Sequence, residues 1–133
     1  MVDQKEASDE HHEQLVAGLA KQMRTILDSS EQPIFLYLDD THKTCNNRFA
    51  TLLGYGSVNE WNKVENSFNA FVHEKSREAI TKAYVDADQH KVGSTLKVTW
   101  NKKSGGSVET DIILVPMLYE EHLFAIMFVS TKK

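Results

Sequence analysis

The sequence lacks the features that mark several classes of protein. Its one cysteine, Cys45, has no partner for an internal disulfide. No apolar run is long enough for a membrane-spanning helix, and no basic segment followed by an apolar one marks a secretory leader. Positive charge is not in excess, because the formal net charge is -4, so affinity for nucleic acid or for an anionic membrane is not expected. We expect a cytoplasmic protein that interacts with small ligands or other proteins.

What is present is the composition of an ordinary globular protein. The chain has 133 residues, of which 41% are hydrophobic and 26% charged, so one domain with a real core is expected. Residues 1–12 are polar and acidic and predict a disordered or frayed tail. Residues 13–28 predict an amphipathic helix, and residues 29–133 predict the core domain.

The helix expected before residue 29 needs a surface to cover. Its apolar side chains recur at three- and four-residue steps and share one side. A helix of about four turns is marginal alone in water, so it must pack on its own domain or on a second copy of itself. The apolar positions are Leu15, Val16, Leu19, Met23, Ile26 and Leu27.

The segment from 33 to 55 predicts a strand, a turn and a helix. Residues 34–38 are apolar at nearly every position, which indicates a strand covered on both faces. The acidic pair Asp39 and Asp40 begins a turn, and Asn46 or Asn47 caps a helix that ends at Gly54. A longer helix is expected over residues 76–89.

After Gly93 the apolar period changes from 3.6 to 2, which predicts three consecutive strands. The second and third of these, over residues 107–117 and 123–129, are apolar on both faces in part of their length. One face would pack on the helices. The other face, with Ile113 and Val115, needs its own cover, for which the helix before residue 29 is the candidate.

Phosphorylated receiver domains also have an acidic pair after their first strand, so that fold is an alternative. A receiver needs a phosphate-accepting aspartate after a second buried parallel strand, and a lysine after a later one, within an alternating strand and helix order. The second half of this chain instead has three strands joined by turns. The receiver is therefore the less favoured interpretation.

The order of elements and several motifs resemble the PAS domain, a family of sensor and signalling modules. Residues 46–55, NNRFATLLGY, are similar to the family's helix after the second strand. Val72 and His73 match the start of the segment before its long helix, although Glu74 stands where proline is usual. Residues 100–108 resemble a later strand and turn, with Ser104 in place of aspartate. The resemblance covers about residues 31–131.

The resemblance implies a fold and two kinds of site. The expected fold is α+β, a five-stranded antiparallel sheet with helices on one face and the N-terminal helix covering the other. PAS domains hold a small ligand, or nothing, between the inner sheet face and the long helix, and commonly dimerise through a preceding helix. The candidate pocket residues, at spacings that are more often those of plain core packing, are Phe68, Phe71, Tyr84, Trp100, Met117 and Met127. The candidate homodimer interface is Leu15, Leu19, Met23, Ile26, Ile113 and Val115.

Each residue that could serve a cofactor also has a structural role. Flavin-binding PAS domains carry a reactive cysteine one helix later than Cys45, so a buried thiol is expected here. Haem-binding members use a histidine near the long helix, where His90 and His73 are the candidates. His11 and His12 are adjacent and point in different directions from a helix, so they predict no metal pair. No cofactor and no metal site is predicted.

No set of residues has the spacing of a catalytic site or a phosphate-binding loop, so an enzyme is not expected. The sequence predicts a non-catalytic PAS sensory and dimerisation module that binds a protein partner in signal transduction, with or without a small ligand. The alternative is a PAS sensor that carries haem or flavin.

Overall fold

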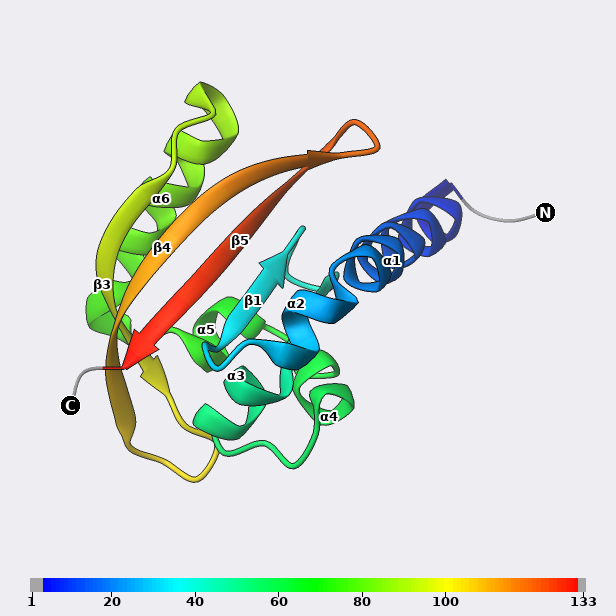
Figure 1. The fold of residues 1–133 in the computed structure, drawn as a ribbon. Coiled ribbons are helices and arrows are strands. Elements are labelled where there is room, and N and C mark those ends of the chain that lie inside the picture. The colour runs from blue at the N-terminus through cyan, green and yellow to red at the C-terminus, as the bar shows by residue number, and fades with distance from the viewer. Residues whose placement is uncertain (1–3, 132–133) are drawn as a thin grey trace.

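The computed structural model describes residues 4–131, in which a five-stranded sheet has helices against both faces (Figure 1). Every neighbouring pair of strands is antiparallel, in the order β2-β1-β5-β4-β3. No helix within these residues is both long and apolar enough to cross a membrane. The elements are α1 (Gln4–Gln22), α2 (Arg24–Ser29), β1 (Ile34–Tyr37), β2 (Lys43–Cys45), α3 (Asn47–Leu52), α4 (Val58–Asn62), α5 (Ser67–Phe71), the 3-10 helix η1 (Glu74–Ser76), α6 (Arg77–His90), β3 (Ser94–Asn101), β4 (Ser107–Tyr119) and β5 (His122–Thr131).

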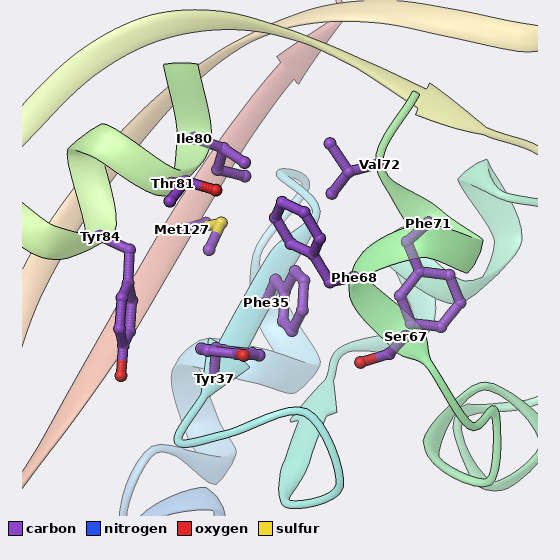
Figure 2. A pocket seen from close by; sticks show the side chains of 10 residues that line it. All are labelled: Phe35, Tyr37, Ser67, Phe68, Phe71, Val72, Ile80, Thr81, Tyr84 and Met127. Carbon is purple, nitrogen blue, oxygen red and sulfur yellow. The ribbon is translucent and has the colours of Figure 1, made fainter. Parts of the chain in front are cut away.

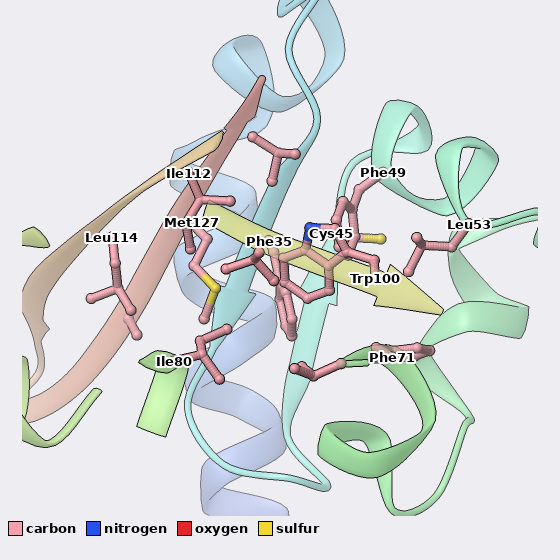
Figure 3. Packing of buried hydrophobic residues seen from close by; sticks show 14 of the residues in the cluster. Phe35, Cys45, Phe49, Leu53, Phe71, Ile80, Trp100, Ile112, Leu114 and Met127 are labelled. Carbon is pink, nitrogen blue, oxygen red and sulfur yellow. The ribbon is translucent and has the colours of Figure 1, made fainter. Parts of the chain in front are cut away.

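The inner face of the sheet packs on helices α3 to α6 and forms the larger of two apolar clusters (Figure 3). Phe35 of β1 lies at its centre and makes ring contacts with Phe49, Trp61 and Trp100 at centroid distances of 5.4, 4.8 and 6.1 Å. Trp61 stacks on Phe71 at 4.7 Å. These rings fill the side of the core next to α3 and α4.

The outer face packs on α1 and α2, which lie on the opposite side of the sheet from α6 (Figure 1). Side chains alternate across a strand, so Ile34 and Leu36 point away from Phe35 and towards α1. The predicted five-stranded antiparallel sheet, with an N-terminal helix over its second face, is confirmed. The outer cluster comprises Leu15, Val16, Leu19, Met23, Leu27, Ile34, Leu36, Leu38, Phe124 and Ile126.

The N-terminal helix differs from the prediction in its bounds. The sequence predicted a frayed tail to residue 12, but α1 begins at Gln4, and residues 1–3 lie outside the described part. This part of α1 contacts the rest of the domain through His12, whose ring packs on those of His42 and His122. The helix also turns at Met23, where φ is -93° and ψ is 9°, so α2 is a separate short helix.

Asn46 joins the start of β1 to the start of α3. Its Oδ1 accepts hydrogen bonds from the N–H groups of Ile34 at 3.0 Å and Phe49 at 3.1 Å. Its Nδ2 donates to the carbonyl of Gln32 at 2.9 Å. The side chain is buried, so these bonds satisfy backbone groups that water does not reach.

Replacing Asn46 with alanine should lower the free energy of unfolding by about 2 to 4 kcal/mol. The change removes the cap of α3 and leaves the buried N–H of Ile34 without a partner. Urea unfolding followed by tryptophan fluorescence measures the loss. Asn47→Ala is the matched control, because Asn47 is exposed, and it should change stability by less than about 0.5 kcal/mol. Equal losses in the two variants would contradict the role given to Asn46.

Candidate functional site

An apolar cavity of about 220 Å³ lies between the inner sheet face and helices α5 and α6 (Figure 2). Its walls come from β1, β5 and both helices. No histidine, cysteine, carboxylate or lysine is among the described residues that line it. The lining residues are Phe35, Tyr37, Ser67, Phe68, Phe71, Val72, Ile80, Thr81, Tyr84 and Met127.

The register of β1 against β5 sets the floor of the cavity. Phe35 is directly opposite Met127, so both side chains project from the inner face beside one another. Ile80 from α6 lies across from them in Figure 2. The floor is therefore wholly apolar.

Two tyrosines supply the polar groups at the more exposed side of the cavity. The rings of Tyr37 and Tyr84 meet edge to face, with centroids 5.5 Å apart. Burial, with smaller contributions from Asp40, Tyr84 and Asp39, raises the pKa of Tyr37 to about 12. Burial also raises the pKa of Tyr84. Both side chains are thus neutral phenols at physiological pH, able to donate and accept hydrogen bonds.

Asp40 fixes the position of α5 and hence of the cavity wall. Its Oδ1 accepts hydrogen bonds from the N–H of Phe68 at 2.9 Å and the hydroxyl of Ser67 at 2.8 Å. Its Oδ2 accepts from the N–H of Ser67 at 3.2 Å. The residue before α5, Asn66, makes no capping bond with its own side chain, so Asp40 caps this helix from the β1–β2 turn.

The structure places four of the six predicted pocket residues in the cavity wall: Phe68, Phe71, Tyr84 and Met127. Trp100 is fully buried but lies outside the lining; its Nε1 donates to the hydroxyl of Thr110 at 2.8 Å. Met117 is on the wrong face for the pocket. It pairs with Phe124, whose side chain points to the outer cluster, and Met117 packs there too.

The prediction missed six of the lining residues, among them Phe35, Tyr37 and Ile80. Phe35 and Tyr37 are two residues apart on β1, so their side chains lie on the same face of the sheet. Ile80 belongs to the apolar stripe of α6 that also holds Ala83 and Ala87. The stripe was a signal that could have identified Ile80. For β1 no such signal existed, because the strand is apolar on both faces and its sequence does not say which face is inner.

The six predicted interface residues differ in how far their own chain covers them. Leu15, Leu19 and Met23 are buried against the outer face of their own sheet. Ile26 and Ile113 remain 51% and 48% exposed. Val115 is partly buried. The helix thus packs on its own chain, and only Ile26 and Ile113 are left largely uncovered.

The two histidines named for haem ligation do not line the cavity. His73 caps η1, since its Nδ1 accepts a hydrogen bond from the N–H of Lys75 at 3.1 Å. His90 is exposed at the end of α6. Neither is placed to ligate a group held between α5, α6 and the sheet, so the residues present do not fit haem.

Cys45 does not line the cavity either. It lies on β2 opposite Phe35, buried in the inner cluster (Figure 3). Burial raises the pKa of its thiol far above the ordinary value, partly offset by the backbone N–H of Ala50 and the charge of Lys43. A thiol that stays protonated is a poor nucleophile. Attack on a flavin in this cavity has no support from its position or its ionisation.

Comparison with solved structures identifies the fold. The PAS domain of an HTR-like protein from Haloarcula marismortui is 14% identical, with a TM-score of 0.65, over 92% of this chain and 99% of that one. A PAS domain from Colwellia psychrerythraea is 18% identical, with a TM-score of 0.64, over 86% and 97%. The PAS domain of nitrogen regulation protein NR(II) from Vibrio parahaemolyticus is 14% identical, with a TM-score of 0.62, over 81% and 95%.

The chain has the PAS fold. The predicted resemblance is therefore confirmed for the architecture. No family model matches the sequence. No curated protein matches it either. Identities this low establish the PAS fold and leave ligand and partner to be argued from the residues themselves.

The Cys45 thiol should react with a disulfide reagent such as DTNB only when the domain opens. In the native protein at pH 8 we expect a rate at least about a thousandfold below that in denaturant, because the thiol is buried and protonated. The protection should persist at pH 9, since the raised pKa keeps the native thiol neutral there.

A double variant, Cys45→Ala with Ser104→Cys, is the control for the DTNB measurement. Ser104 is exposed in the β3–β4 turn, so its cysteine should react at the rate of a free thiol. Native Cys45 reacting as fast as this exposed thiol would contradict its inert, structural role.

Proposed function

We propose that this PAS domain is a non-catalytic sensory module that binds a small, largely apolar molecule in the cavity between α5, α6 and the sheet. The observation that carries the proposal is the composition of the cavity wall. Its floor is apolar, and its polar groups are two neutral phenols and the hydroxyls of Ser67 and Thr81. An apolar pocket with a few polar groups at one side is typical of small-molecule sites.

The size of the cavity limits the ligand. Drug-sized ligands occupy pockets of about 300 to 1,000 Å³, whereas an apolar cavity of about 150 Å³ holds benzene. At about 220 Å³ this cavity suits a ligand between one and two rings in size. Haem and flavin are larger, so a cofactor-bearing sensor is not the function that we favour.

We also propose that the protein forms a homodimer through the part of the outer sheet face that α1 and α2 do not cover. Ile113 on β4 and Ile26 on α2 are large apolar side chains exposed on this side of the sheet. Phe128 lies opposite Ile113 on β5 and is only partly buried. Pairing of two such surfaces would remove these side chains from water. A signalling partner protein is the alternative occupant of the same surface.

Binding of a small aromatic probe tests the cavity. Benzene or indole should shift the amide resonances of Phe35, Phe68 and Met127 saturably, because these residues line the space that the probe fills. Thr81→Trp places a large ring at the exposed side of the cavity and should weaken binding at least about tenfold. NMR titration measures both effects.

The control for the cavity experiment is Val85→Trp. Val85 lies one turn after Thr81 on α6 and is exposed, but it does not line the cavity. This variant should bind the probe as the parent does. Absence of saturable shifts in the parent protein, or equal loss in both variants, would refute the proposed ligand site.

Ile113→Lys should convert the dimer into a monomer, because it puts a charge at the centre of the proposed contact. Light scattering coupled to gel filtration measures the mass. Val92→Lys is the matched control: Val92 is 51% exposed after α6, away from the outer sheet face, and this variant should remain dimeric. A monomeric parent protein, or a dimer that Ile113→Lys leaves intact, would refute the interface.

A further inference from the structure

Four of the chain's six histidines gather at one end of the molecule, outside the cavity. His11 and His12 come from α1, His42 from the β1–β2 turn and His122 from the start of β5. The ring of His12 lies 5.2 Å from that of His42 and 5.4 Å from that of His122. His11 lies 5.3 Å from His122. The fold thus brings together histidines from three separate parts of the sequence.

A carboxylate lies among these rings. Asp39 Oδ1 is 2.7 Å from Nδ1 of His42, and Asp39 Oδ2 is 3.5 Å from Nδ1 of His12. One ligand atom from each of His12, Asp39 and His42 lies within 4.8 Å of the other two. Tetrahedral ligands around zinc are about 3.4 Å apart, so a modest inward movement of these side chains would bring them into coordination distance.

We propose that His12, Asp39 and His42 bind a divalent transition-metal ion of the zinc type. Two imidazole nitrogens and one carboxylate oxygen are ligands that zinc accepts, with water in the fourth position. Magnesium and calcium prefer sites built from oxygen ligands alone, so they fit this set poorly. The sequence alone brings only His11 and His12 next to each other, and a helix points adjacent side chains apart. The partners of His12 come from elsewhere in the fold.

The backbone of the β1–β2 turn positions the Asp39 carboxylate. The hydrogen bonds from Thr41 N at 3.0 Å and His42 N at 2.8 Å fix the direction of the carboxylate. These bonds orient one ligand before any ion arrives.

A metal at this position would connect α1 to the β1–β2 turn, which caps α5 through Asp40. His12 belongs to α1, whereas Asp39 precedes Asp40, the cap of α5. Coordination would therefore hold α1 against the β1–β2 turn at a point beyond the outer apolar cluster. The site and the cavity are distinct, so metal binding does not depend on the proposed ligand.

Titration of the untagged full chain with Zn²⁺ alone tests the site. Calorimetry should give one ion per chain, and His12→Gln and Asp39→Asn should each weaken binding at least tenfold. His90→Gln is the matched control, because His90 is exposed at the far end of α6 and should leave the affinity unchanged. Mg²⁺ should not compete at a hundredfold excess over Zn²⁺.

Co²⁺ provides a second readout that does not depend on the stability of the variants. Bound to the parent protein, it should give visible absorption bands of a four-coordinate ion, and Zn²⁺ should remove them. Circular dichroism identifies any variant that fails to fold, in which case His12→Gln, at the partly exposed ligand, decides the result. Absence of Zn²⁺ binding by the parent, equal affinity in His12→Gln, or an equal loss in His90→Gln would overturn the proposal.

Discussion

Burial of β1 and β5 on both faces is the constraint on which the rest of the structure depends. Ile34, Leu36, Phe124 and Ile126 face one way, and Phe35 and Met127 face the other. A two-sided apolar strand is stable in water only where helices cover both faces. The inner cover comes from α3 to α6. The outer cover has to come from α1 and α2, and this requirement explains why the N-terminal helix packs on its own chain.

The turn between β1 and β2 links the two sides of the sheet. Asp40 reaches forward along the chain to cap α5 on the inner side, and Asp39 reaches His12 of α1 on the outer side. A few residues further on, Asn46 closes the hairpin by binding both Ile34 and Phe49. The acidic pair that resembles a phosphorylation site is therefore a structural junction. Asp40 accepts hydrogen bonds from the start of α5, and Asp39 contacts His12 and His42.

The sequence was most informative where a pattern of residues is compatible with only one local structure. The alternation over residues 96–101 and the apolar stripe of α6 each correspond to a single local structure. It was least informative in strands that are apolar on both faces, because the same residue pattern then fits either orientation of the strand. Met117 was assigned to the inner face, and only its register against Phe124 places it on the outer one.

Contacts between distant segments left no local signal in the sequence at all. Lys43, the first residue of β2, is buried, and its ammonium donates hydrogen bonds to the carbonyls of Asn62 and Val64 at 3.1 Å each. The partners of His12 are equally remote along the chain. One consequence matters for any sensory role. Because neighbouring residues of β1 face opposite sides, Phe35 in the cavity wall and Leu36 under α1 are separated by a single peptide unit. A ligand that pushes on Phe35 and moves β1 would therefore also move Leu36 against α1, which couples the cavity to the packing of the N-terminal helix.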